Sequence, residues 1–280
     1  MSAPVTFTPM PTATMLNPLV NYLRKASVEI TGKQIEKIPL LRAGFAEGST
    51  VFVALIDAAE LDLQIDAVAA LRAAGYNPLP HIPARFVRDA DDLKRRLEAF
   101  VVRGGVTDVL VLGGGASTPI GKYDAAIQIL ETGAFQQAGI KRIGIAGHPE
   151  GNPDITKVHG EAMLLSVLKQ KNDWLTENGV DGFIATQFLF DAMPVAHWAT
   201  ELRSAGIGLP IHVGVPGPAS IKTLVKYAAM CGVGNSARFI RKQALNLTKL
   251  LSVSEPTEVV DQLATLHFDK PELGIAAPHL

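Results

Sequence analysis

The amino-acid sequence predicts a (β/α)8 barrel, an α/β fold in which eight parallel strands alternate with helices. Three observations support this fold class. Short apolar runs rich in Val, Ile and Leu recur along the chain, and each is followed by a polar or Gly/Pro-containing turn and then by a segment of helical periodicity. Such runs are typical of strands buried on both faces of a parallel sheet. The chain of 280 residues has the length of one such barrel.

The strands and helices can be placed in order along the chain. In the helix predicted at 61–74, for example, Leu61, Ile65, Val68 and Leu71 recur at spacings of three and four residues. The predicted strands are 27–30, 50–56, 77–82, 108–113, 142–147, 182–187, 210–215 and 263–268. The predicted helices are one within 36–49, then 61–74, 89–102, 163–175, 195–205 and 219–230, an extra helix at 235–251 before the last strand, and a short one at 256–263.

The chain is predicted to form a single domain. Residues 1–16 are rich in Pro, Thr and Met and aperiodic, so we expect a loosely ordered N-terminal arm before a barrel domain at 17–280. No linker or change in composition divides the rest of the sequence. A doubly wound open sheet is the alternative architecture, but its Gly-x-Gly-x-x-Gly turn is missing after the first strand.

Composition narrows the class of function. The net charge is −1 and no Lys/Arg block occurs, which argues against a nucleic-acid partner and against a polybasic membrane surface. The apolar runs are too short to span a bilayer, and the amino terminus does not resemble a signal peptide. The single cysteine, Cys231, excludes an internal disulfide and a thiolate metal site, and we expect it to be a buried small hydrophobe. We therefore expect a soluble cytoplasmic protein, and its His, Glu and Asp residues are too scattered to predict a metal site.

Polar residues collect at the carboxyl ends of the predicted strands, where (β/α)8 barrels carry their active sites. The fifth strand is followed by His148-Pro149-Glu150-Gly151-Asn152-Pro153-Asp154. Two prolines four residues apart fit neither a helix interior nor a central strand, so we expect a stiff loop that presents His148 and Glu150. The other polar or flexible positions on these strands are Glu29, Asp57, His81, Gly113-Gly114-Gly115, Gln187, 214–218 and His267.

Two of these residues favour a functional interpretation. Glu29 lies between Val28 and Ile30, and a carboxylate inside a barrel is costly unless it pairs with a neighbour or acts in catalysis. We favour catalysis for Glu29. The amide of Gln187 suits the edge of an amide-containing heterocycle, although a structural hydrogen bond to a loop would use the same groups.

The remaining positions have structural interpretations of equal or greater weight. His81 by itself would more often be a core histidine, and His148 with Glu150 could brace their own loop. The three glycines would serve a turn as well as a phosphate or a ring. Asp57 could cap the helix that follows it.

Three segments together resemble methylenetetrahydrofolate reductases. They are His148-Pro-Glu-Gly-Asn-Pro-Asp154, Gly182-Phe-Ile-Ala-Thr-Gln-Phe-Leu-Phe-Asp191 and Leu266-His-Phe268, and Lys169-Gln-Lys171 stands ahead of the second segment as in the family. The similarity covers most of the predicted barrel and is clearest from about 142 to 235. The family fold is a (β/α)8 barrel that carries FAD, which agrees with the strand pattern.

The resemblance implies an oxidoreductase that interconverts 5,10-methylenetetrahydrofolate and 5-methyltetrahydrofolate with NAD(P)H through bound FAD, in one-carbon metabolism and methionine biosynthesis. Glu29 would be the general acid that protonates the bridging nitrogen and opens the five-membered ring to an iminium, which hydride then reduces. Such an acid should have a raised pKa. Gln187 would hold the pterin with Phe188 beside it. The flavin contacts would be His81, Gly113, Gly114, Gly115, His148, Asn152 and Lys171, with Lys171 near a phosphate. The resemblance also implies a homo-oligomer.

The sequence departs from the family pattern at several of these positions. The first strand reads Val28-Glu-Ile-Thr-Gly-Lys33, without the family's aromatic and proline pairs, and Gly113-Gly-Gly115 replaces Arg-Gly-Asp. His148 stands in place of a tyrosine and Asn152 in place of a histidine. Loss of a carboxylate beside the flavin should raise its reduction potential. A flavin-free variant would pass hydride directly from NAD(P)H to the iminium.

Two functions from other classes stay open at this point. One is a pterin-dependent methyltransferase-type barrel, which needs no redox cofactor. The other is a non-catalytic folate-binding subunit, which the missing charged flavin contacts favour. A flavin spectrum would argue against the first, and flavin that NADH reduces and folate reoxidises would argue against the second.

Overall fold

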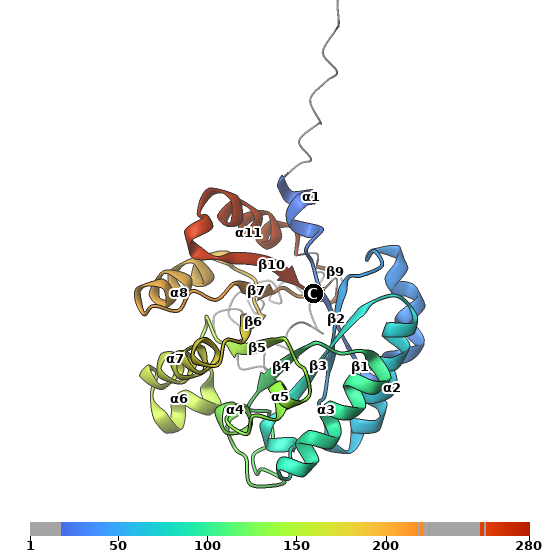
Figure 1. The fold of residues 1–280 in the computed structure, drawn as a ribbon. Helices are drawn as coiled ribbons and strands as arrows, with labels where there is room; N and C mark the ends of the chain where they lie inside the picture. Colours follow the sequence, from blue (N-terminus) through green and yellow to red (C-terminus); the bar gives the residue numbers. More distant parts are fainter. Residues whose placement is uncertain (1–17, 218, 221–223, 225–252, 255) are drawn as a thin grey trace, which may run out of the picture.

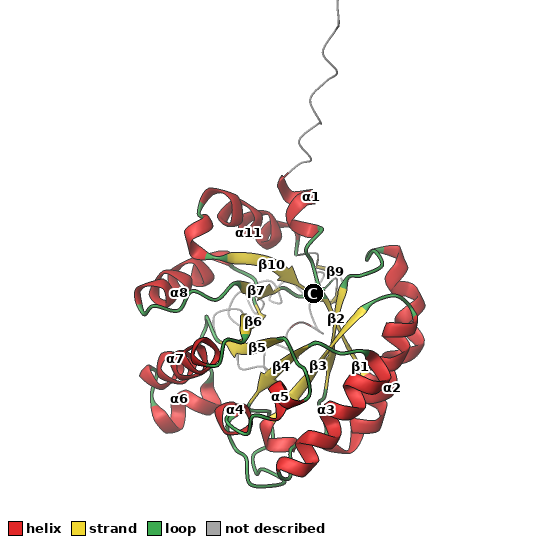
Figure 2. Cartoon of the chain, in the orientation of Figure 1, coloured by secondary structure: helices red, strands yellow, loops and turns green. Residues whose placement is uncertain are grey.

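A computed structural model describes residues 18–217, 219–220, 224, 253–254 and 256–280. Eight parallel strands form a barrel whose outside is covered by helices, and the two kinds of element alternate along the chain (Figures 1 and 2). This confirms the predicted fold class. The strands, in their order around the barrel, are β1 (Val28–Thr31), β2 (Thr50–Ala54), β3 (Asn77–Pro83), β4 (Asp108–Leu112), β5 (Arg142–Gly147), β6 (Asp181–Phe188), β7 (Ile211–Gly214) and β10 (Ile275–His279).

The barrel closes between its first and last strands. The amide of Ser27 donates to the carbonyl of Pro278 at 3.1 Å, and the amide of Leu280 donates to the carbonyl of Ser27 at 2.9 Å. The amide of Glu29 donates to the carbonyl of Leu280 at 2.7 Å. The end of β10 is therefore fixed beside the residue that we expect to be catalytic.

The predicted eighth strand is wrong. Residues 263–268 belong to helix α11 (Thr257–Asp269), and the true closing strand is β10. Val259, Val260, Leu263 and Ala264 form the buried stripe of α11, so helical periodicity runs on through the segment that we expected to be a strand. His267 consequently lies on this outer helix and not in the barrel wall.

Four of the predicted helices are confirmed with small changes at their ends. They are α2 (Leu61–Ala73), α3 (Ala90–Gly104), α7 (Ala162–Glu177) and α8 (Ala192–Ser204). The first predicted helix is a 3-10 helix, η1 (Gly32–Ala43). The other described elements are α1 (Pro18–Leu23), η2 (Ala58–Glu60), η3 (Ala84–Phe86), α4 (Ala126–Leu130), α5 (Ala134–Gln137), α6 (Pro153–His159), η5 (Pro271–Leu273) and the antiparallel pair β8 (Ala219–Ser220) and β9 (Val253–Ser254).

Several predictions fall outside the described residues. These are the arm at 1–16, the extra helix at 235–251, Cys231 and most of the helix at 219–230, whose first two residues lie in β8 instead. Within the described part of the chain, no helix has the length and apolar character that crossing a membrane requires.

Alternation along the strands divides the apolar residues into two cores. The larger core lies between the barrel wall and the helices. The smaller one fills the barrel interior and consists of Phe52, Leu79, Leu110, Phe183 and Ala185. A Cβ atom at Gly144 would lie 2.3 Å from the Phe183 ring, so the glycine in β5 makes room for that ring inside the barrel. Residues that share the inward face with this core are the ones that can reach a ligand in the barrel.

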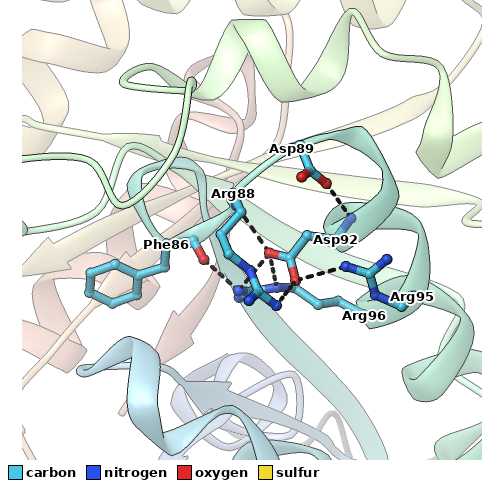
Figure 3. A network of polar contacts seen from close by, with 6 residues as sticks. All are labelled: Phe86, Arg88, Asp89, Asp92, Arg95 and Arg96. Atoms are coloured by element: carbon cyan, nitrogen blue, oxygen red, sulfur yellow. Dashed lines mark hydrogen bonds and ion pairs between the residues drawn. The ribbon is translucent and has the colours of Figure 1, made fainter.

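A charged network fixes the connection between β3 and α3 (Figure 3). The Asp92 side chain is 3% exposed, and its carboxylate accepts from the Arg88 amide, the Arg88 guanidinium and Nε of Arg96, each at 3.0 Å. The buried Arg96 guanidinium also donates to the Phe86 carbonyl. This network holds the turn that follows His81.

Asp92→Asn should therefore destabilise the protein strongly. The change leaves the Arg96 guanidinium buried without its counter-ion, and breaking a buried ion pair in this way costs about 3 kcal/mol or more. Urea unfolding should show the loss as a lower midpoint, while Asp91→Asn, at an exposed position one residue earlier, should leave the midpoint unchanged. Equal stability of the two variants would contradict a structural role for the network.

Candidate functional site

Glu29 faces the barrel interior between two histidines. Oε2 of Glu29 lies 3.3 Å from Nε2 of His81 on β3 and 3.5 Å from Nε2 of His279 on β10. Val28 and Ile30, on either side of Glu29 in the sequence, point outward into the core beneath the helices. The Glu29 side chain remains 39% exposed, so solvent or a ligand can reach it.

The expected raised pKa of Glu29 is wrong. Burial by itself raises the pKa of this carboxyl, but the charges of His81 and His279 and the hydrogen bond with His279 outweigh burial, and the pKa lies below its usual value. The expectation rested on the apolar sequence neighbours, which face away from the carboxyl group. In the free protein Glu29 is therefore an ionised carboxylate at neutral pH.

The two histidines are held by the surrounding barrel. The Phe52 ring stacks at a tilt on His279, with 4.2 Å between centroids, and meets His81 edge-on at 5.9 Å. Nε2 of the buried Gln64 donates to the carbonyls of His81 and Val53, at 2.9 and 2.8 Å. Burial lowers the pKa of His81, and the Glu29 charge offsets this only in part.

Gln187 and Phe188 lie at the end of β6. Alternation along the strand places Gln187 on the face of Phe183 and Ala185, which looks into the barrel, and Gln187 is exposed there. Pairing with β7 shifts register between Ala185 and Phe188, and the Phe188 ring packs edge-on against Phe190. Their contact with substrate stays a prediction.

Lys171 and His148 come together at the end of β5. Lys171 on α7 is 8% exposed, and its Nζ lies 3.5 Å from the Ala146 carbonyl oxygen. Burial lowers the pKa of Lys171 to about 8. Burial, with a smaller contribution from the Lys171 charge, lowers the pKa of His148 to about 4. No acidic side chain of the described residues forms an ion pair with this ammonium, which therefore suits an anionic ligand.

The loop with three glycines packs against the end of β3. Gly114 has a positive φ of 94°, and a Cβ atom there would lie 2.9 Å from Cβ of Pro83. The Arg85 amide donates to the Gly113 carbonyl at 2.9 Å, and the Arg85 guanidinium donates to the Ala116 carbonyl at 2.9 Å. Gly114 is thus required by the turn, whereas Gly113 and Gly115 have open space where a side chain would stand.

Two further predicted residues lie where helices begin. Asp57 accepts from the Ala59 amide at 2.9 Å and caps η2, as its structural interpretation proposed. The Asn152 carbonyl accepts the amides of Ile155 and Thr156 where α6 begins. In the described part of the chain, no group of three His, Cys, Asp or Glu residues could hold a metal ion.

The buried histidines make stability depend on pH. Burial lowers the pKa of His148 to about 4 and that of His212 on β7 to about 3, and both return to about 6.5 on unfolding. The unfolded chain then binds more protons than the fold between pH 6.5 and pH 4, so stability falls as the pH falls through this window. Urea unfolding at pH 7.5 and pH 5 should show a smaller loss for His148→Gln than for wild type, while the exposed His197→Gln should match wild type.

His279, Ser27 and Gln64 are the residues that the sequence analysis missed. His279 was overlooked because the last strand was placed too early, although Ile275-Ala-Ala-Pro after Gly274 is itself a short apolar run that follows a turn residue. Nothing in the sequence singles out Gln64, whose side chain hydrogen-bonds to the backbone carbonyls of two strands. The structure thus brings Glu29, His81 and His279 together in one group and His148 and Lys171 together in a second.

Comparisons with known proteins give one partial sequence match and several distant structural matches. No family model matches the chain. A segment of 87 residues, 31% of the chain, is 38% identical to methylenetetrahydrofolate reductase 2 of Saccharomyces cerevisiae, and the match spans 12% of that protein. Among solved structures, a triosephosphate isomerase from Bartonella henselae is 13% identical with a TM-score of 0.44, over 74% of this chain and 88% of the other. A protein of Burkholderia cenocepacia J2315, provisionally described as a phosphonomutase, is 15% identical with a TM-score of 0.46, over 88% and 98%.

Proposed function

We propose that this protein is an oxidoreductase that interconverts 5,10-methylenetetrahydrofolate and 5-methyltetrahydrofolate with NAD(P)H. The observation that carries the proposal is the ionised, partly exposed Glu29 carboxylate that two imidazoles hold inside the barrel. Reduction of the methylene group passes through a cationic iminium, and a fixed carboxylate stabilises such a cation. The partial similarity to a yeast methylenetetrahydrofolate reductase points in the same direction.

Glu29 has two tasks in this reaction. It accepts a proton and passes it to the bridging nitrogen, whose bond to the one-carbon unit then breaks, and the returning carboxylate faces the iminium until hydride reduces it to the methyl group. A bound pterin ring covers the exposed part of the carboxyl group and so raises its pKa toward the value that a proton donor needs. The amide of Gln187 holds the edge of the pterin.

The second group of residues fits the phosphates of a dinucleotide. The Lys171 ammonium is buried without an acidic partner among the described residues, and the open sides of Gly113 and Gly115 let a ligand approach their backbone. Lys171, His148, Asn152 and the two glycines would hold FAD. The chemistry that FAD supplies when bound is hydride transfer from NAD(P)H to the folate.

The proposal is tested by the flavin itself. Purified protein should be yellow, NADH should bleach the flavin absorbance in an anaerobic stopped-flow experiment, and methylenetetrahydrofolate should restore it. If a colourless protein still forms 5-methyltetrahydrofolate, hydride passes directly from NAD(P)H to the folate without FAD, and the proposed reaction stands. A flavin that NADH bleaches and folate fails to reoxidise would contradict the proposed function.

A further inference from the structure

A serine joins the Glu29 group, which consists of Glu29, His81 and His279. It lies at the seam of the barrel, where the first strand β1 meets the last strand β10. Oγ of Ser27 lies 2.9 Å from Nδ1 of His279, and Nε2 of the same ring lies 3.5 Å from Oε2 of Glu29. Ser27 is 2% exposed and His279 8% exposed. Backbone hydrogen bonds on both sides of Ser27 fix its position against β10. The three side chains therefore form a continuous chain from a closed seam to a solvent-accessible carboxylate.

The hydroxyl group suits a histidine that changes its protonation state. A hydroxyl can donate to Nδ1 of a neutral imidazole and can accept from the Nδ1–H of an imidazolium after it rotates. In both states the ring can direct an Nε2–H at Glu29. A backbone carbonyl in the place of Ser27 could only accept, and it would satisfy Nδ1 only while that nitrogen is protonated.

The same residue types form the triad of serine hydrolases, but the arrangement here differs. In that triad the serine faces Nε2 and the carboxylate faces Nδ1, and the serine hydroxyl is open to substrate. Here the two nitrogens are exchanged, and the Ser27 hydroxyl is buried in the seam, where no substrate carbonyl can reach it. Ser27 is thus a partner of the ring and not a nucleophile.

We propose that His279 is a positioning residue that stores the proton that Glu29 delivers, and that Ser27 holds its ring in both protonation states. The inference rests on the proposed folate chemistry. The Nε2–H bond of the imidazolium breaks as an O–H bond forms on Oε2 of Glu29. The carboxyl group then gives this proton to the bridging nitrogen as the C–N bond breaks. Solvent returns a proton to His279 after each turnover.

The other titratable groups around the site do not compete for this role. The groups that face Glu29 and His279 are His81 on β3 and His212 on β7. Burial lowers the pKa of His81, and its Nε2 has no hydrogen-bond partner among the described residues. His212 lies beside Arg142, whose Nη2 is 3.4 Å from its Nε2, and burial with that charge lowers the pKa of His212 to about 3. His279 alone of these histidines combines contact with Glu29 and a hydroxyl partner.

The pH profile of kcat for methylenetetrahydrofolate reduction tests the inference. Wild-type kcat should fall at alkaline pH as the imidazolium is lost. His279→Gln can still donate to Glu29 but cannot titrate, so its kcat should be lower by roughly tenfold to a hundredfold and the alkaline limb should disappear. In Ser27→Ala the ring loses the hydroxyl that holds Nδ1 in both protonation states, so kcat should fall and its pH profile should differ from that of wild type. Ser27→Thr keeps the hydroxyl and should restore the wild-type profile.

Controls separate this result from loss of the fold or of the function. His197→Gln changes an exposed histidine on α8 and should leave the profile unchanged. If His279→Gln does not fold, the Ser27→Ala and Ser27→Thr pair decides, and superimposable profiles for wild type and Ser27→Ala overturn the inference. An active wild type with an unaltered His279→Gln profile overturns the inference alone. A wild type without folate turnover overturns the proposed function as well.

Discussion

Glu29→Gln should abolish folate turnover while the protein keeps its fold and its dinucleotide site. Glutamine has nearly the same shape and can still hydrogen-bond to His279, but it carries neither the charge that stabilises the iminium nor the proton for the bridging nitrogen. Loss of a general acid typically lowers kcat by about 10²- to 10⁴-fold. The measurement is kcat for methylenetetrahydrofolate reduction beside NADH oxidation with a quinone acceptor, which needs no acid and should change less than about twofold.

The matched control for this variant is Glu36→Gln. Glu36 is an exposed carboxylate on η1, the element that follows β1, and its removal should leave both activities unchanged. A parallel loss of folate reduction and quinone reduction in Glu29→Gln would mean that Glu29 supports the barrel and not the reaction.

Lys171→Met should weaken dinucleotide binding and stabilise the fold at the same time. The ammonium is buried without an acidic partner in the described part of the chain, so replacing it by an apolar side chain of similar length removes a desolvation cost. Hydrogen bonds to charged groups contribute about 1.5–3 kcal/mol, so the Kd for the dinucleotide should rise roughly tenfold to a hundredfold. Fluorescence titrations with FAD and with NADPH measure the affinity, and thermal unfolding measures the stability.

The pH dependence of dinucleotide affinity is a second test of Lys171. Because the pKa of Lys171 is about 8, the ammonium is lost above that pH and wild-type affinity should fall there, while Lys171→Met should show no such fall. Lys169→Met is the control, since Lys169 pairs with Asp173 on the exposed side of the same helix. An unchanged Kd in Lys171→Met would remove Lys171 from the cofactor site.

Most of the barrel could be predicted from the sequence, and the exception has a physical cause. Seven strands follow turn residues and carry apolar residues, and most of them are rich in Val or Ile, a pattern typical of buried parallel strands. The eighth, Ile275–His279, carries two alanines and a proline, so it has little strand character of its own. The preceding helix α11 has the stronger apolar pattern, and the sequence analysis divided it wrongly into a short helix at 256–263 and a strand at 263–268.

The site was predictable in its residue types but not in its electrostatics. Glu29 stands out in the sequence because a carboxylate interrupts an apolar run. The groups that set its pKa, His81 and His279, come from strands far away in the chain, and sequence neighbours carry no information about them. His148 was proposed from its loop after the fifth strand and Lys171 from a family resemblance, and their proximity became visible only when α7 packed against β5.

The most direct test of the account is the product formed from methylenetetrahydrofolate. Purified protein, incubated anaerobically with excess FAD and either NADH or NADPH, should convert the substrate to 5-methyltetrahydrofolate, identified by mass spectrometry, with one product molecule for each NAD(P)H consumed. The Glu29→Gln variant should form almost none under the same conditions. Wild-type protein that forms no 5-methyltetrahydrofolate with either nucleotide, or a Glu29→Gln variant that forms it at the wild-type rate, would contradict the account.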